Sequence, residues 1–153
     1  MRIIKIDHSN VFKLSPVSAR WLGETKSLMP VTPESGTKQI MEWLGDPTCA
    51  IFALVDDLAD GFPYVGFLAC HVHRYPFWKD KVVGEMGWYV VPEYRGQGLQ
   101  LLKAMEQFGV DNDAKFMVMN IRLSAGGDGG ARACAALEKV GFQEFERIYY
   151  RKI

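Results

Sequence analysis

Apolar and polar positions change their spacing along the chain in a way that predicts both strands and helices. Short apolar runs rich in β-branched and aromatic residues have the length and composition of buried strands. Segments whose apolar residues recur three or four positions apart have the pattern of amphipathic helices. The predicted strands are residues 2–7, 49–56, 64–74, 82–91, 116–124 and 146–152. Two helices are predicted between the first and second strands, and one on either side of the fifth.

Capping and turn residues indicate where these helices begin and end. Ser15-Pro16 combines a serine cap with a proline in the first turn, and Thr32-Pro33-Glu34 repeats the signal with an acidic residue. Gly45 is a suitable end for the second helix. The third helix has Leu101, Leu102, Met105 and Phe108 on one face, and the fourth covers residues 131–140.

The predicted order of elements is β-α-α-β-β-β-α-β-α-β. Residues 49–91 contain three strands joined by turn segments and favour an antiparallel meander. The alternation of strands and helices after residue 80 requires parallel pairing as well. The chain has 153 residues and is 48% hydrophobic, which suits a single domain, residues 1–153, with a substantial core. We therefore expect an α/β (α+β) protein with one mixed, twisted sheet and helices on both faces.

Charge and cysteine content narrow the partners and the compartment. Eighteen basic residues balance eighteen acidic ones, which argues against nucleic acid or an anionic membrane as the main partner. The longest apolar run, 49–55, is too short to cross a bilayer. Cys49, Cys70 and Cys134 are widely spaced and form no Cys-x-x-Cys pair. They indicate free thiols in a reducing cytoplasm, with no metal site and no disulfide.

The segment from Gly87 to Leu99 carries the clearest chemical signal. Its sequence, Gly-Trp-Tyr-Val-Val-Pro-Glu-Tyr-Arg-Gly-Gln-Gly-Leu, predicts a strand that ends at a proline, a turn with two glycines, and the start of a helix. Backbone N–H groups at such a helix start can bind an anion such as a diphosphate. The segment lacks the Gly-Lys-Ser/Thr of a P-loop. It also lacks the third glycine of a dinucleotide fingerprint, because Leu101 holds that place.

The same turn resembles the acyl-CoA turn of the GNAT superfamily of N-acyltransferases. That signature is Arg or Gln, two free positions, Gly, one free position, and then Gly or Ala. Residues 95–100, Arg-Gly-Gln-Gly-Leu-Gln, match the arginine and the first required glycine, and Gln100 replaces the final small residue. Residues 133–142, which end in Glu-Lys-Val-Gly-Phe, resemble the end of the family's fourth helix. The order of elements is also the GNAT order, so the resemblance covers nearly the whole chain.

The resemblance implies that acetyl-CoA binds where two parallel strands, here 82–91 and 116–124, splay apart. In the family, the amide-rich pantetheine arm pairs with strand backbone in that gap. The alternative to a cofactor-binding turn at residues 95–100 is a plain strand-to-helix turn, in which glycine serves only to make the turn tight. The residues that the resemblance assigns to the cofactor are Val90 and Val91 for the arm, Gly96, Gln97, Gly98, Leu99 and Gln100 for the pyrophosphate, and Arg95 as a charge near the phosphates.

Acyl transfer to an amine requires a base, a donor for the oxyanion and an acid for the leaving thiolate. Glu85 is the candidate for the base, because family members often carry a catalytic glutamate before the cofactor-contacting part of this strand. A solvated carboxylate at a strand edge is the alternative. His71 and His73 alternate on the preceding strand, so they share one face and could act as base or acid or be structural.

We therefore expect an N-acetyltransferase that moves an acetyl group from acetyl-CoA to an amine by direct attack in a ternary complex. No cysteine is spaced with a histidine as an obvious nucleophilic pair. The acceptor is expected to be a small molecule or a protein amino group. The aromatic loop Tyr75-Pro76-Phe77-Trp78, with Trp21 and Met29, would form the acceptor pocket, or else fill the core or contact a second copy in a homodimer.

A second hypothesis is a non-catalytic GNAT-like module that binds acyl-CoA or a protein partner. Three departures from the family pattern favour it. Gln100 replaces the last small residue of the turn, Leu137 replaces the fourth-helix tyrosine that often serves as acid, and Gly130 replaces an asparagine near the start of that helix. Transfer of a longer acyl group is a third hypothesis. Turnover separates the first hypothesis from the second, and acyl-chain preference separates the first from the third.

Overall fold

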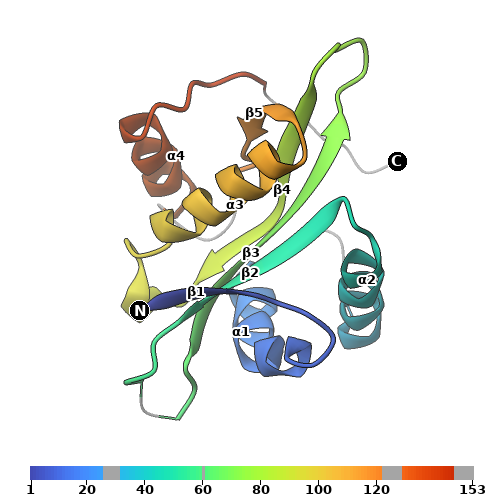
Figure 1. Ribbon diagram of the computed structural model, residues 1–153. Coiled ribbons are helices and arrows are strands. Elements are labelled where there is room, and N and C mark those ends of the chain that lie inside the picture. The colour runs from blue at the N-terminus through green and yellow to red at the C-terminus, as the bar shows by residue number, and fades with distance from the viewer. Residues whose placement is uncertain (26–31, 60, 122–128, 147–153) are drawn as a thin grey trace, which may run out of the picture. The chain divides into compact units, whose positions relative to one another are not determined.

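The structure is a computed structural model that describes residues 1–25, 32–59, 61–121 and 129–146 (Figure 1). The chain divides into two compact units, Met1–Asn120 and Ile121–Ile153. Each unit is described by itself. No helix in the described part of the chain has the length and apolar content needed to cross a bilayer.

The first unit is built on one five-stranded sheet of the order β1-β2-β3-β4-β5. The first three pairings are antiparallel, and β5 pairs with β4 in parallel. The predicted mixed sheet is therefore confirmed. The elements are β1 (Arg2–Lys5), the 3-10 helix η1 (Val11–Leu14), α1 (Ser15–Thr25), α2 (Pro33–Gly45), β2 (Cys49–Val55), β3 (Tyr64–Arg74), β4 (Lys81–Val90), the 3-10 helix η2 (Pro92–Tyr94), α3 (Leu99–Asp111) and β5 (Ala114–Val118).

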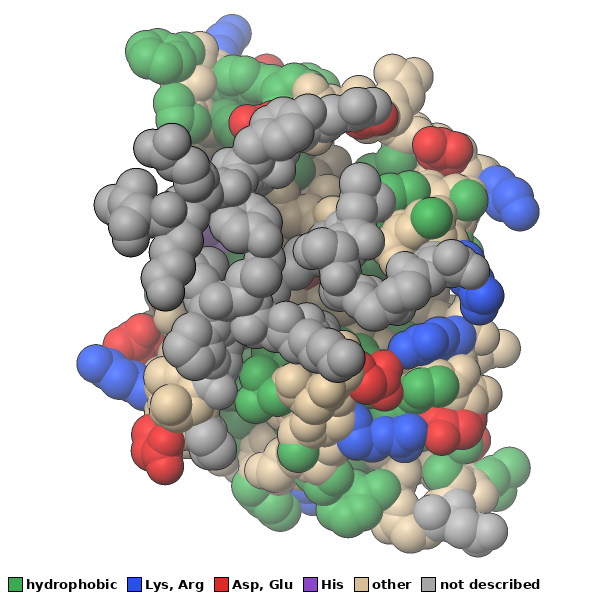
Figure 2. Space-filling model, turned by 180° about the vertical axis from the view of Figure 1, so that it is seen from behind, with side chains coloured by type: hydrophobic (Ala, Val, Ile, Leu, Met, Phe, Trp, Pro, Cys, Tyr) green, Lys and Arg blue, Asp and Glu red, His purple; other side chains and the backbone are tan. Residues whose placement is uncertain are grey.

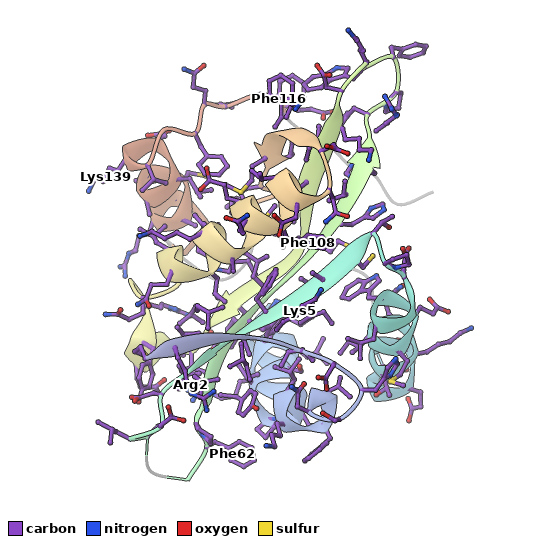
Figure 3. All side chains as sticks on the ribbon, viewed as in Figure 1. Arg2, Lys5, Phe62, Phe108, Phe116 and Lys139 are labelled. Atoms are coloured by element: carbon purple, nitrogen blue, oxygen red, sulfur yellow. The ribbon has the colours of Figure 1, made fainter. Side chains whose placement is uncertain are left out.

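Within this unit, α1 and α2 cover one face of the sheet and α3 covers the other (Figure 1). β2 and β3 are buried at almost every position, as expected for central strands covered on both faces. On the α3 face, the Phe108 ring lies edge-on to Phe52 of β2, with ring centroids 6.3 Å apart. The ammonium group of Lys5 lies 5.4 Å from the centre of the same ring, so a cation–π contact joins α3 to β1 (Figure 3).

The two first helices begin differently from each other. Thr32 caps α2 through a reciprocal capping box with Ser35, as its sequence predicts. The prediction of a serine cap at Ser15 is wrong. The 3-10 helix η1 leads directly into α1, and Ser15 already has helical backbone angles, φ −50° and ψ −46°. A residue inside the helical turn cannot provide the extended backbone of an N-cap.

In the second unit, α4 (Gly129–Lys139) confirms the fourth predicted helix within two residues at its start. It ends in a Schellman motif, in which the N–H of Phe142 bonds to the carbonyl of Leu137 and the N–H of Gly141 bonds to that of Glu138. Gly141 has φ +95°, so the motif accounts for the Gly-Phe that ends the family-like segment. Of the predicted strand 146–152, residue 146 is not in a strand and the rest lies outside the described residues.

The predicted strand 116–124 is too long and starts too late. β5 covers Ala114–Val118, because Asp113, at φ +64°, turns the chain sharply out of α3. Residues 119–121 follow without strand structure, and 122–124 lie outside the described residues.

Acidic and basic side chains are interspersed on the described part of the face seen in Figure 2, in keeping with their equal numbers.

Candidate active site

β4 and β5 are paired only at the beginning of their course. The last aligned pair is Gly84 opposite Val118. β4 continues to Val90 with β3 as its partner, whereas residues 119–121 after β5 are not in a strand. Within the described residues, the edge of β4 beyond Gly84 therefore has no strand beside it on the β5 side. Backbone groups along that edge can accept an extended, amide-containing ligand as they would a strand.

Glu85 is the first residue of β4 beyond this pairing, and Asn120 holds it there. The backbone N–H of Asn120 donates to Oε2 of Glu85 at 3.3 Å, and its side-chain amide donates to the Glu85 carbonyl at 3.1 Å. Glu85 is 9% exposed and is the one buried charged residue among those the structure describes. Its carboxylate therefore has a fixed position at the point where the strands separate.

A β-bulge in β4 follows directly after Glu85. On β3, Cys70 lies opposite Glu85 and Ala69 lies opposite Gly87, so Met86 has no partner of its own. A bulge of this kind bends its strand and changes the direction of the side chains and backbone groups that follow. The chain thus changes direction within one residue of the candidate base. Nothing in the alternation of apolar residues reveals this bulge.

The chain leaves β4 through η2 and a glycine turn, and α3 begins at Leu99. Gly96 has φ +98°, a left-handed backbone conformation that residues with a side chain rarely adopt. In the described part of the chain, the backbone N–H groups of Gly96, Gly98 and Leu99 have no hydrogen-bond acceptor. Three unpaired donors at the positive end of a helix form a place where an anion can bind.

Gly98 serves the packing of this turn. Its φ of −63° is ordinary, but a Cβ at this position would lie 2.8 Å from Cγ2 of Val90 and 3.2 Å from Nε1 of Trp88. The indole Nε1 of Trp88 is buried and has no hydrogen-bond partner within the described residues. The turn therefore lies against the end of β4, beside a buried donor without an acceptor.

Arg95, expected near the phosphates, is paired with α1. Its guanidinium donates to Oε2 of Glu24 at 2.7 Å, and the Tyr89 hydroxyl donates to the other carboxylate oxygen at 2.6 Å. Burial, and next the hydrogen bond to Glu24, raise the pKa of Tyr89 above its ordinary value. Glu24 thus links α1, β4 and the glycine turn. Its role was not foreseen, because nothing in the sequence near Glu24 points to a residue 71 positions away.

Some of the other residues assigned to the cofactor already use their polar groups in hydrogen bonds within the protein. The N–H of Val91 donates to the Val65 carbonyl, and the Val91 carbonyl accepts from Tyr94. Successive residues of a strand direct their N–H groups to opposite edges, so the N–H of Val90 points to the edge that β5 has left. The side chains of Gln97 and Gln100 bond to each other at 2.7 Å.

The two histidines of β3 share one face, as predicted. The rings of His71 and His73 are stacked with centroids 4.8 Å apart, and His73 is 5.6 Å from the Tyr75 ring. Trp78 continues the row, 5.5 Å from Tyr75 and 5.4 Å from Phe116 of β5. Burial, and next the charge of His73, lower the pKa of His71. The loop thus forms an aromatic row with β3 and β5. Trp21 instead packs edge-on to Phe67, with centroids 5.4 Å apart, and Met29 lies outside the described residues.

The fold also brings a cysteine to a histidine, which the sequence analysis did not expect. Cys49 of β2 is directly opposite His71 of β3. The pairing is invisible in the sequence because it depends on the register of two antiparallel strands. Burial, and next the charge of Asp46, raise the pKa of the Cys49 thiol, so the thiol is protonated near neutral pH. The pair therefore lacks the thiolate that a nucleophilic cysteine needs.

Comparison with known protein families gives a match over most of the chain. Residues 19–142 match the family described as the Acetyltransferase (GNAT) family. The chain belongs to the GNAT acetyltransferase family. The match covers most of the chain, including β4, the turn, α3 and α4, so the resemblance stated from the sequence is confirmed. A comparison with curated proteins gives no match.

Solved structures of acetyltransferases share this fold. A crystal structure of a probable acetyltransferase has a TM-score of 0.76 and 22% identity, covering 100% of this chain and 98% of that chain. AAC(6')-Iy, in complex with the bisubstrate analogue CoA-S-monomethyl-acetylneamine, has a TM-score of 0.72 and 24% identity, covering 99% and 97%. The aminoglycoside 6'-N-acetyltransferase AAC(6')-Ih from Acinetobacter baumannii has a TM-score of 0.71 and 18% identity, covering 99% and 97%.

Proposed function

We propose that this GNAT protein is an acetyl-CoA-dependent N-acetyltransferase that acts on an amine by direct attack in a ternary complex. One observation carries the proposal: the strand pairing ends at Gly84, and the next residue is a buried glutamate held by Asn120. An open strand edge, a fixed carboxylate and an anion-binding turn then follow one another along β4. Together these three features suit acyl transfer from a coenzyme A thioester, because they could hold its amide-rich arm, its pyrophosphate and the proton of the attacking amine.

The proposed cofactor site uses the unpaired polar groups of β4 and the turn. The N–H groups of Gly96, Gly98 and Leu99 would bind the pyrophosphate, supported by the positive end of α3. The indole N–H of Trp88 beside Gly98 supplies a further donor, since it has no partner within the described residues. Their fit to an anion with several oxygen acceptors supports acetyl-CoA, and an AAC(6')-Iy structure contains CoA.

The pantetheine arm would run along the open edge of β4. In this proposal the N–H of Val90 contacts the arm, while the N–H and carbonyl of Val91 keep their bonds to Val65 and Tyr94. Gln97 and Gln100 form part of the turn itself. The hydrogen bond between their side-chain amides would break if either side chain turned towards the phosphates. Arg95 contributes through Glu24, by fixing the turn against α1.

Glu85 would act as the general base. The ammonium group of the acceptor gives a proton to the carboxylate, directly or through water, and the free amine attacks the thioester carbonyl carbon. The carbon–sulfur bond breaks, and the thiolate leaves with a proton from solvent or from the attacking nitrogen. Asn120 positions the base, because its two hydrogen bonds hold both the backbone and the carboxylate of Glu85.

The acceptor is proposed to be a small molecule with a primary amine. The bisubstrate analogue bound to AAC(6')-Iy carries an acetylated neamine, and a small amine is therefore the class to screen first. The aromatic row of Tyr75, Trp78 and Phe116 is a surface on which a flat or cationic acceptor can stack. A protein amino group is the second class.

Steady-state turnover with Glu85→Gln tests this proposal. Glutamine keeps an oxygen that can accept from the Asn120 N–H, so the fold should persist while the base is lost. We expect kcat to fall by about 10²–10⁴-fold, with little change in the affinity for acetyl-CoA. Release of the CoA thiol, followed with a disulfide reagent over a panel of amines, is the assay. Unchanged kcat in Glu85→Gln would remove Glu85 from this role.

A non-catalytic acyl-CoA-binding module is the second candidate. It is favoured by Leu137, which is 5% exposed and occupies the position where the family often has a tyrosine that acts as general acid. Saturable binding of acetyl-CoA without thiol release for any amine, small or protein-bound, would support this candidate. Thiol release with any one amine would exclude it.

A further inference from the structure

Three side chains that could each bind a metal ion through a different kind of atom lie close together between the end of α2 and the sheet. Asp46 follows the last residue of α2, Cys49 begins β2, and His71 lies in β3. One carboxylate oxygen, the sulfur and one imidazole nitrogen all lie within 4.8 Å of one another. None of the three side chains is assigned a chemical step in the proposed acetyl transfer. By strand alternation, His71 and Cys70 point to opposite faces of the sheet, and Glu85 is paired with Cys70.

The surrounding contacts hold these three side chains in place. Cys49 and His71 are opposite each other in the ladder between β2 and β3. Oδ1 of Asp46 accepts from the N–H and the hydroxyl of Thr48, at 2.8 and 2.6 Å, which leaves Oδ2 outside those two bonds. The His71 ring is stacked on His73, with centroids 4.8 Å apart. Donors fixed by secondary structure and neighbouring contacts lose little freedom when they bind an ion.

We propose that Asp46, Cys49 and His71 bind a zinc ion. Thiolate and imidazole are the ligands that zinc prefers, whereas magnesium and calcium prefer oxygen alone. Bonds of about 2.0–2.3 Å in a tetrahedral site put neighbouring ligand atoms roughly 3.3–3.6 Å apart. The observed separations, all within 4.8 Å, exceed that value by at most about 1.5 Å, which small side-chain rotations can close. Water takes the fourth position, and the Cys49 thiol releases its proton to solvent as the sulfur binds the metal.

The spacing of these three residues along the chain does not reveal such a site. Asp46 and Cys49 are three positions apart, but His71 is 22 positions further along the chain and arrives only through the pairing of β2 with β3. The expectation of free thiols without metal was based on the absence of Cys-x-x-Cys spacing. The ion would join the end of α2 to two strands of the sheet, so zinc should also raise the midpoint of thermal unfolding.

Titration of the metal-free, full-length protein tests the proposal. Zinc is added in competition with a chromophoric chelator, and cobalt replaces zinc in a parallel absorption experiment. We expect one equivalent of zinc to bind, and the cobalt form to show a thiolate charge-transfer band with the d–d bands of a tetrahedral site. Cys49→Ser should weaken zinc binding at least tenfold and abolish the charge-transfer band.

Matched variants separate this site from other surface ligands. Cys134→Ser changes another half-exposed cysteine, and His8→Gln changes an exposed histidine, so both should keep full zinc affinity. Asp46→Asn retains an oxygen for the Thr48 bonds and should weaken binding without disturbing the fold, which circular dichroism checks. No binding at micromolar zinc overturns the proposal. So does binding that survives in Cys49→Ser or, if that variant does not fold, in Asp46→Asn.

Discussion

Replacing Gly98 with alanine tests how the glycine turn is positioned. The added Cβ would lie 2.8 Å from Val90 Cγ2 and 3.2 Å from Trp88 Nε1, so the Val90 or Trp88 side chain, or the turn itself, would have to shift. Overpacking of this kind costs typically about 1–3 kcal/mol. Because φ at Gly98 is −63°, alanine brings no backbone strain and returns about 0.4–1 kcal/mol by restricting the unfolded chain. We therefore expect Gly98→Ala to lower the free energy of unfolding by roughly 1–2 kcal/mol.

Urea denaturation followed by circular dichroism measures this change. Gly23→Ala is the matched control, because Gly23 lies in α1 with nothing within 4 Å of its would-be Cβ. It should stabilise the protein by about 0.5–1 kcal/mol. Combining Gly98→Ala with Val90→Ala removes the nearest methyl, so the cost of the glycine change should fall by about 1 kcal/mol in that background. If Gly98→Ala matched Gly23→Ala in sign, the steric explanation of Gly98 would be wrong.

Four further predictions concern stability and thiol chemistry. Cys70 is 0% exposed, and burial raises its pKa to about 12. When the folded protein is treated with an alkylating reagent at pH 8, mass spectrometry should find Cys70 unmodified and Cys49 modified. Equal alkylation rates for the two thiols would contradict the burial of Cys70. Since the ordinary pKa of that thiol is 9.0, the unfolded chain loses this proton first, and the Cys70 contribution to stability should decline as pH rises from about 9 towards 12. Tyr89→Phe removes the 2.6 Å bond to Glu24 and should cost about 1–2 kcal/mol in urea denaturation; no loss would mean that the bond contributes nothing. Thr32→Ala removes the capping box of α2 and should cost about 1 kcal/mol, and unchanged thermal unfolding would argue against it.

Much of the fold follows from local patterns in the sequence. Residues 64–74 were predicted as a strand with the bounds of β3, because the run is apolar and bordered by turn residues. The start of α2 was predicted from Thr32, whose side chain acts on its own neighbours. The start of α1 was missed, because the 3-10 helix before Ser15 has no distinct signal and changes the role of that serine.

The candidate site could be predicted only where its geometry is local. The glycine turn was predicted from adjacent residues, and the φ of +98° at Gly96 is a conformation that glycine adopts readily in such a turn. The bulge after Glu85 and the two bonds from Asn120 depend on strand register and were not foreseen. The Arg95–Glu24 pair was missed for the same reason, because it joins residues from separate elements.

Calorimetric titration of the purified, full-length protein with acetyl-CoA, and with free CoA in parallel, tests the central claim most directly. The account predicts saturable binding of both ligands at one site. It also predicts much weaker binding to Gly96→Val, because a β-branched residue resists the φ of +98° that the turn requires. Absence of binding at millimolar ligand, or equal binding by Gly96→Val, would contradict the proposal that β4 and the glycine turn hold the acetyl donor.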